Sequence, residues 1–253
     1  MRKFSTFVAF LCVAALAAPA IAADNSITGW VQGHGKVRPQ TTTAKRLPPA
    51  SRKSSAGKAS PNAQTVYTVR ATFDAAAPGL ASEDYEDGNV PTGGVSGCVS
   101  PMTPTSSDPP CIDPGDIAAG LNVAAVNIVG ANGLAMAGAG FSGNPTKTVV
   151  SNYFTDNTDY LLVNTPTPFA FGIDLQAFFT GVTLTITLFN GATLIGTYTS
   201  PSSNAGVFWG ITDDTNPCTR VNVTDPSGAN AEGGDNLEFG VLIPVELQSF
   251  EVE

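Results

Sequence analysis

The stretch VTLTITLFNGATLIGTY, residues 182–198, predicts a β-hairpin. Apolar side chains alternate with threonines from Val182 to Leu188, which is the period of a strand with one buried face. The dipeptide Asn190-Gly191 then separates two β-like runs. Asn-Gly favours a type I′ turn, because both central residues of that turn need positive φ angles. We therefore expect two antiparallel strands here, with Val182, Leu184, Ile186 and Leu188 directed inward.

Other short apolar runs are separated by Gly, Pro and Asn, and they predict further strands. The run TVYTVRATF, residues 65–73, alternates in the same way and is expected to be a strand. Residues 117–136 are rich in Ala, but their glycines argue against more than a turn of helix. We expect an all-β domain over residues 65–253, an antiparallel sandwich. The remaining strand candidates are TDYLLVN, FAFGIDL, VFWGI, TRVNV, NLEFGVL and VELQSFEV.

The N-terminus has the pattern of a secretory signal peptide. Arg2 and Lys3 precede the apolar run FVAFLCVAALAAPAIA, which ends in small residues. This predicts a signal peptide over residues 1–23. The alternative is an uncleaved anchor, but the run is short for a membrane span and Pro19 interrupts it. No later segment is a continuous apolar stretch of membrane length, so we expect a secreted or extracellular protein, with the periplasm as the alternative.

Residues 24–64 form a basic, low-complexity arm. From Asp24 to Arg70 there are eight basic residues and one acidic residue, whereas two basic and twenty acidic residues follow Arg70. The arm has almost no large apolar side chain, so it cannot offset the entropy of ordering and is expected to be disordered. It could attach to an anionic surface such as lipopolysaccharide or nucleic acid, or it could be a solvated linker. The linker is the simpler interpretation, and we expect no nucleic-acid partner.

Cys98 and Cys111 bracket a Pro- and Ser-rich loop and are expected to form a disulfide in an oxidising compartment. Closing this loop would contribute about 2–3 kcal/mol by restricting the unfolded chain. Cys218 is left over. It could be a buried thiol at the start of a strand, pair with one of the other two, or bridge to another molecule.

Several catalytic chemistries are excluded by residue type. The single histidine is His34 in the arm, so the domain has no Ser-His-Asp or Cys-His apparatus and no histidine metal site. The densest acidic cluster is Glu83–Asp87, and a glycosidase needs two carboxyl groups that flank the scissile bond. We do not expect an enzyme. Sugar-binding surfaces commonly use exposed aromatic rings, whereas Trp209 lies in the apolar run FWGI and is interpreted as a core residue.

Several stretches, taken in order, resemble exported bacterial β-sandwich domains of the kind found in PEP-CTERM-type surface proteins. The resemblance covers most of residues 66–240. It implies a jelly-roll-like sandwich similar to galactose-binding-like and carbohydrate-binding modules. The chain ends in IPVELQSFEVE without a Pro-Glu-Pro motif, so anchoring by that route is not expected. The stretches are VRATFDAAAPGLASEDYEDG, DPGDIAAGLNV, PFAFGIDLQAF, VTLTITLFNGATLIGTYT, VFWGIT and DNLEFG.

The same resemblance implies a structural calcium site. In such jelly rolls an early acidic segment meets a late Asp-Asp-like pair, and calcium prefers carboxylate, amide and carbonyl oxygens. Glu86 and Asp235 are the first candidate ligands, followed by Asp84 and Asn236; a solvated acidic loop is the alternative. Asp213-Asp214 is interpreted as a turn.

These features together predict a non-catalytic exported binding or surface-interaction module. A glycan or the envelope surface is the expected partner, with Ca²⁺ as a structural ion. The alternatives are a structural matrix or envelope protein without a small ligand, and a carboxylate-dependent glycoside hydrolase.

Overall fold

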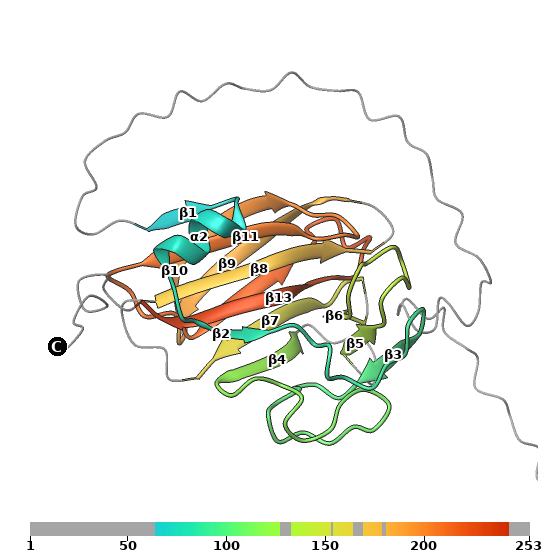
Figure 1. The fold of residues 1–253 in the computed structure, drawn as a ribbon. Helices are drawn as coiled ribbons and strands as arrows, with labels where there is room; N and C mark the ends of the chain where they lie inside the picture. The colour runs from blue at the N-terminus through green and yellow to red at the C-terminus, as the bar shows by residue number, and fades with distance from the viewer. Residues whose placement is uncertain (1–63, 127–132, 153, 164–168, 179–180, 243–253) are drawn as a thin grey trace, which may run out of the picture.

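The computed structural model describes residues 64–126, 133–152, 154–163, 169–178 and 181–242. Within these ranges the chain is an all-β sandwich of two antiparallel sheets (Figure 1), which confirms the predicted fold class; the jelly-roll resemblance stays a prediction. The signal peptide, most of the arm and the last strand candidate lie outside the described residues. No helix in the described ranges is long and apolar enough to cross a membrane.

The larger sheet has the strand order β1-β11-β8-β13-β6-β5-β3, and β2 also pairs with β13. The smaller sheet has the order β10-β9-β12-β7-β4. The strands of the larger sheet are β1 (Thr65–Tyr67), β2 (Ala81–Glu83), β3 (Val95–Cys98), β5 (Leu134–Ala137), β6 (Thr148–Ser151), β8 (Phe169–Ala177), β11 (Val207–Asp213) and β13 (Glu232–Val241). Those of the smaller sheet are β4 (Leu121–Val126), β7 (Asn157–Leu162), β9 (Thr183–Asn190), β10 (Thr193–Pro201) and β12 (Arg220–Thr224).

The predicted hairpin forms from β9 and β10, but its turn is shifted by one residue. Asn190 pairs with Thr193 at the end of the ladder, so Gly191 and Ala192 make the loop. Gly191 has φ +58° and Asn190 does not have positive φ, so the expected type I′ geometry on Asn190-Gly191 is wrong. The glycine supplies the left-handed conformation at the first loop position, where it has no Cβ to clash.

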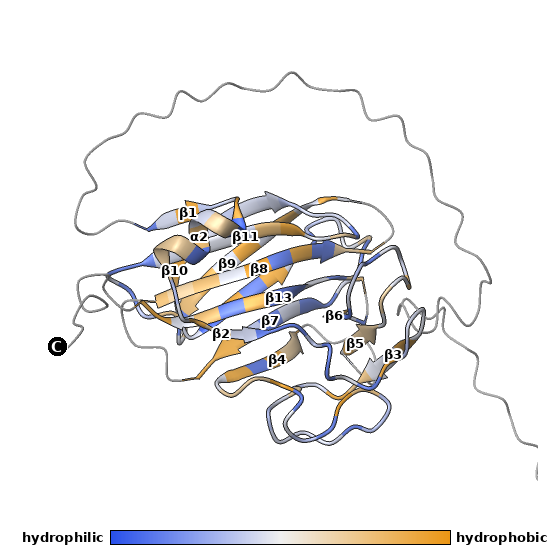
Figure 2. Cartoon of the chain, viewed as in Figure 1, coloured by the Kyte–Doolittle hydropathy of each residue, from blue (hydrophilic) through white to orange (hydrophobic). Residues whose placement is uncertain are grey.

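The main core lies between the two sheets and is built by the alternating faces of the long strands. Hydrophobic and hydrophilic residues share β8 and β13 (Figure 2), because one face of each strand meets the other sheet and the opposite face does not. Trp209 is 1% exposed in this core, as predicted. The inward side chains include Phe171, Ile173 and Leu175 from β8 and Leu184, Ile186 and Leu188 from β9.

The strand predicted over residues 65–73 is wrong beyond Tyr67. The chain forms helix α2 (Arg70–Ala76), which lies on the outer face of the larger sheet (Figure 1). Gly172 in β8 pairs with Gly210 in β11, and a Cβ at either position would lie 2.8 Å from the ring of Phe73. The two glycines therefore open a slot that buries this ring completely, and this tertiary contact overrides the strand-like alternation.

The cysteine prediction is confirmed in its main part. Cys98 and Cys111 form a disulfide with a Cα–Cα distance of 5.7 Å. Cys218 is buried two residues before β12, with its Sγ atom 3.4 Å from the Arg220 carbonyl oxygen. Burial raises the pKa of this thiol to about 11. Pairing with Cys98 or Cys111 is excluded, since those two pair with each other.

Candidate functional site

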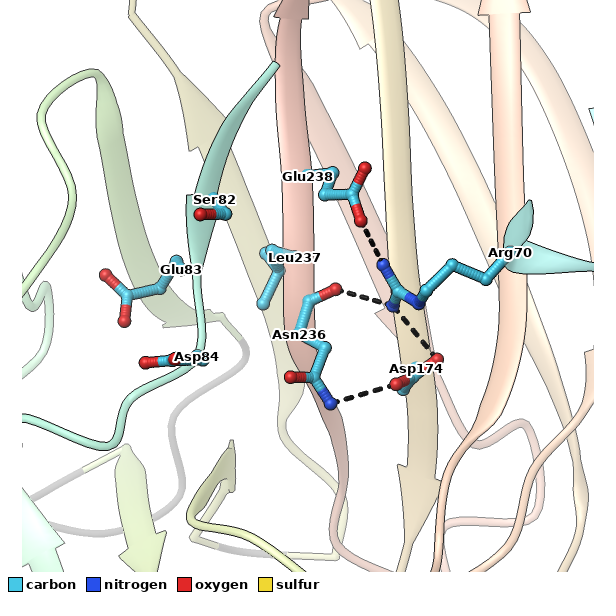
Figure 3. A pocket seen from close by; sticks show the side chains of 8 residues that line it. All are labelled: Arg70, Ser82, Glu83, Asp84, Asp174, Asn236, Leu237 and Glu238. Atoms are coloured by element: carbon cyan, nitrogen blue, oxygen red, sulfur yellow. Dashed lines mark hydrogen bonds and ion pairs between the residues drawn. The ribbon is translucent and has the colours of Figure 1, made fainter. Parts of the chain in front are cut away.

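A polar groove lies on the outer face of the larger sheet, where β2, β13 and β8 are consecutive neighbours (Figure 3). Its volume is about 440 Å³. Four of its eight lining residues carry carboxylates and one carries a positive charge, so the groove is acidic overall. The lining residues are Arg70, Ser82, Glu83, Asp84, Asp174, Asn236, Leu237 and Glu238.

Arg70, the first residue of α2, connects the strands under the groove. Its Nη2 atom lies 3.0 Å from Asp174 Oδ1 on β8 and 2.7 Å from the Asn236 carbonyl oxygen on β13. Its Nη1 atom pairs with Glu238, and its guanidinium lies 4.5 Å from the ring centroid of Phe208. These contacts use the planar fork of the guanidinium on several partners at once. Arg70 therefore fixes the relative positions of two carboxylates on neighbouring strands.

The opposite wall of the groove is the end of β2 and the segment after it. Glu83 is buried, and its two carboxyl oxygens accept hydrogen bonds from the backbone N–H groups of Tyr85 (2.7 Å) and Ala118 (2.6 Å). Burial raises the pKa of Glu83 above its ordinary value, although these two bonds oppose the change. Asp84 is exposed and lines both this groove and an adjoining hollow that Asp87 and Asp116 help to form.

Two of the four predicted calcium ligands are held by one short segment. Thr146 Oγ1 donates a hydrogen bond to the carboxylate of Asp235, and the next backbone N–H, that of Lys147, donates to Glu86 Oε1 at 2.7 Å. Lys147 Nζ also donates to the Glu86 carbonyl oxygen at 2.6 Å. The structure thus brings Glu86 and Asp235, which are far apart in the sequence, to two consecutive residues, Lys147 and Thr146 respectively.

The other two candidates, Asp84 and Asn236, line the groove instead. Asp84 Oδ1 accepts a bond from the Glu86 N–H at 3.1 Å, and the Asn236 side-chain amide donates to Asp174 Oδ2 at 3.0 Å. Within the described chain, the non-glycine residues with positive φ are Tyr85 (55°) and Asn236 (48°). Both are adjacent to a predicted ligand, and such unusual backbone angles concentrate at functional sites.

The pKa of Asp235 is raised in the folded protein. Its side chain is completely buried, and burial raises its pKa to about 7; the nearby carboxylates Asp174 and Glu86 push in the same direction, while bonds from Thr146 and Asn236 oppose them. A buried acid beside two others has the electrostatic environment that a cation would relieve.

The residues fit calcium only in part. Glu86 and Asp235 would hold the ion and contribute hard oxygens, but Thr146, Lys147 and Asn236 already donate hydrogen bonds to them. No group of three or more His, Cys, Asp or Glu side chains in the described ranges is arranged to hold a metal. Calcium binding here would have to replace some of these donors, so the site remains a prediction.

Asp213, interpreted from sequence as a turn residue, stabilises the turn that follows it by accepting hydrogen bonds from the backbone. It ends β11, and its Oδ1 atom accepts bonds from the N–H groups of Thr215 (2.8 Å) and Asn216 (3.0 Å). Burial alone would raise the pKa of Asp213, but hydrogen bonds from Asn216, Gln64 and Thr215 lower it to about 2.

Three charged groove residues were not predicted from the sequence as site residues. Asp174 and Glu238 lie within runs predicted as strands, and their outward orientation follows from the alternation with inward residues such as Ile173 and Phe239. Their closeness follows only from the pairing of β8 with β13. Arg70 was expected in a strand over residues 65–73, and nothing in its local sequence shows that it pairs with Asp174 and Glu238.

Comparison of the chain with protein-family models, with characterised proteins and with solved structures gave no significant match.

Proposed function

We propose that this protein is a non-catalytic exported binding module that takes an uncharged glycan in the groove between β2 and Arg70. The observation that carries the proposal is the groove itself, a preorganised row of hydrogen-bonding groups on three paired strands. Carboxylate and amide oxygens accept hydrogen bonds from sugar hydroxyls. The excess of negative charge disfavours anionic polymers, since like charges at an interface are repulsive.

The bonding of the groove carboxylates supports a binding role over a hydrolytic one. Asp174 and Glu238 are paired with Arg70, and both oxygens of Glu83 are occupied by backbone N–H groups. A glycosidase needs one carboxyl group placed to protonate the leaving oxygen and a second placed to attack or to activate water. Carboxylates that are fixed in structural bonds serve as static acceptors more readily than as proton carriers.

The groove offers little apolar surface. Leu237 is buried, and Phe208 lies against the guanidinium of Arg70 and is not among the lining residues. The proposal therefore rests on the hydrogen-bonding groups, which suit the hydroxyl groups of a sugar. The predicted calcium at Glu86 and Asp235 would have a structural role beside this groove.

The test is a binding screen of the full chain against neutral, cationic and anionic oligosaccharides, followed by titration of each hit. Asp84→Asn is the probe, because Asp84 is exposed, lines the groove and keeps its acceptor for the Glu86 N–H as asparagine. Asp214→Asn is the matched control on an exposed acid outside the groove. We expect a neutral glycan to bind the wild type and to bind Asp84→Asn about tenfold more weakly, a loss of one charge-assisted hydrogen bond.

Equal affinity of the wild type and Asp84→Asn for every bound glycan would place the ligand elsewhere. Failure of all glycans to bind would favour the structural matrix protein. Hydrolysis of a bound glycan, abolished by Glu83→Gln, would favour the enzyme.

A further inference from the structure

The groove and the hollow beside it carry negative charge that no ion pair within the described ranges neutralises. Asp84 lines both, and Asp87 and Asp116 line the hollow. The described ranges contain three basic residues, and all three already pair with other acids. These pairs are Arg70 with Asp174 and Glu238, Lys147 with Glu86, and Arg220 with Asp159. The uncompensated carboxylates therefore favour a cationic ligand along this part of the surface.

Acidic side chains lie close together at both walls of the groove. Burial raises the pKa of Glu83, and the nearby carboxylates of Asp84 and Asp87 raise it further. At the other wall, burial raises the pKa of Glu238, and Asp74 on α2 adds to this effect while Arg70 opposes it. An extended cationic segment would thus meet carboxylates from helix α2 to the hollow.

The positive charge that the domain lacks is present in the arm of the same chain. Residues 24–64 contain seven basic residues and one acidic residue, Asp24. Five of the seven lie in KRLPPASRKSSAGK, residues 45–58, which contains no acid. Complementary charge on two surfaces steers them together and favours their association.

The arm joins the domain within reach of the groove. Gln64 Nε2 donates hydrogen bonds to Asp213 Oδ2 at 2.7 Å and to the Ile195 carbonyl oxygen at 3.3 Å, so the end of the arm is fixed. Arg70, which lines the groove, is six residues later, so its Cα atom lies at most about 22 Å from that of Gln64. A flexible linker from Lys53 to Gln64 has a root-mean-square span of about 17–20 Å. The tether therefore matches the distance, which gives an effective concentration of about a millimolar.

We propose that residues 45–58 dock in the groove of the same molecule, with Lys53 and Lys58 beside Asp84 and Asp87, and that they compete there with the glycan. The competition rests on the proposed function of the groove, whereas the docking does not. Because Asp84 and Asp87 are exposed, salt screens the attraction. The arm is then a salt-sensitive inhibitor that occupies the groove at low ionic strength and leaves it as the ionic strength rises.

The docking is tested in the full chain, without a glycan, by cross-linking with a water-soluble carbodiimide, which joins a lysine amine directly to a carboxylate. Mass spectrometry locates the links, and a mixture of unlabelled and ¹⁵N-labelled chains separates links within one molecule from links between two. We expect Lys53 and Lys58 to link to Asp84 and Asp87 at least about threefold more often than to Asp214. This preference should be present at an ionic strength of about 0.01 M and lost at about 1 M, where the Debye length is about 3 Å.

Asp214 is the control because it is exposed and lies next to the attachment point of the arm. It follows Asp213, which binds Gln64, so a tethered arm that does not dock would link to Asp214 at least as often as to the groove. Asp87→Asn should lower the links to Asp84 about threefold by removing one attractive charge, and Asp214→Asn should leave them unchanged. The docking is overturned by links that favour Asp214, by links mainly between molecules, or by an unchanged Asp84 yield in Asp87→Asn.

The competition is tested separately with the neutral glycan that binds most tightly. A variant carrying Arg52→Gln, Lys53→Gln and Lys58→Gln should bind it about three- to tenfold more tightly than the wild type at about 0.01 M ionic strength, and equally at about 1 M. Equal affinities at both ionic strengths would overturn the competition. Because the cross-links are measured without a glycan, a groove that binds no sugar would contradict the proposed function and leave the docking result unaffected.

Discussion

The guanidinium of Arg70 lies 3.0 Å from the carboxylate of Asp174, and this ion pair joins the start of helix α2 to the middle of β8. The same guanidinium pairs with Glu238 and contacts the carbonyl oxygen of Asn236 on β13. One side chain therefore connects an N-terminal segment to two strands that are adjacent only in the folded sheet. It also sets the shape of the groove in which we place the ligand.

Replacing Arg70 should destabilise the protein and loosen the groove. Arg70→Ala leaves Asp174 and Glu238 side by side without a counter-charge. Because the pair is partly exposed to solvent, we expect a loss of about 1–3 kcal/mol in the free energy of unfolding, measured by urea denaturation. Arg70→Lys retains the charge but not the fork, so it should recover only part of the loss. Full recovery with lysine would show that charge alone matters here.

The slot for Phe73 predicts non-additive effects of two substitutions. Gly172→Ala places a Cβ atom 2.8 Å from the Phe73 ring and 3.2 Å from the Phe208 ring, so overpacking should cost about 1–3 kcal/mol. In a Phe73→Ala background the main clash is gone. The cost of Gly172→Ala should then fall by about 0.5–3 kcal/mol, as expected for residues in direct contact. Additive losses of unfolding free energy in the double-mutant cycle would contradict the close contact between Gly172 and the Phe73 ring.

Asp235 should make stability depend on pH in calcium-free buffer. Its pKa is about 7 in the folded protein and lies near 3.9 in an unfolded chain, so the folded state holds the proton more tightly. The resulting stabilisation is fully present below about pH 4 and is lost as the pH rises through 7. Asparagine does not titrate. We therefore expect the free energy of unfolding of Asp235→Asn minus that of the wild type to be about 1–3 kcal/mol larger at pH 8 than at pH 5, because only the wild type loses stability as the pH rises.

The comparison at two pH values cancels the titration of groups that both proteins share. Asp214→Asn, an exposed acid, should show the same difference from wild type at both pH values. An equally constant difference for Asp235→Asn would mean that this carboxyl group does not titrate in the expected range.

The disulfide between Cys98 and Cys111 should stabilise the folded protein mainly by restricting the unfolded chain. It closes a loop with a sequence separation of 13 residues. Replacing both cysteines by alanine should lower the free energy of unfolding by about 3 kcal/mol, measured by urea denaturation. Adding a thiol reductant should destabilise the wild type by a similar amount and leave the double variant unchanged. A reductant effect on the double variant would point to Cys218 instead.

Local alternation was sufficient to predict most of the sandwich. The β9 strand from Thr183 to Asn190 buries the predicted residues, since a period of two depends only on neighbours in the sequence. Helix α2 was missed because its cause lies elsewhere in the chain. The slot that receives Phe73 is made by Gly172 and Gly210, and their pairing across β8 and β11 cannot be read from residues 65–76.

The residues of the candidate site were also predicted only in part from the sequence. Glu86 and Asp235 were selected from sequence, and the structure shows that two consecutive residues bind them, Thr146 binding Asp235 and Lys147 binding Glu86. Asp174 and Glu238 belong to ordinary strand runs, and they meet only through the register of β8 and β13.

The most direct test of the binding proposal is hydrogen–deuterium exchange of the full chain with and without the neutral glycan that binds most tightly. The groove assignment predicts slower exchange in residues 81–87 and 234–238, the two walls on β2 and β13, and unchanged exchange in the Asp213–Asn216 turn, which lies outside the groove. Protection confined to other segments, with residues 81–87 and 234–238 unchanged, would contradict the assignment of the groove as the glycan site.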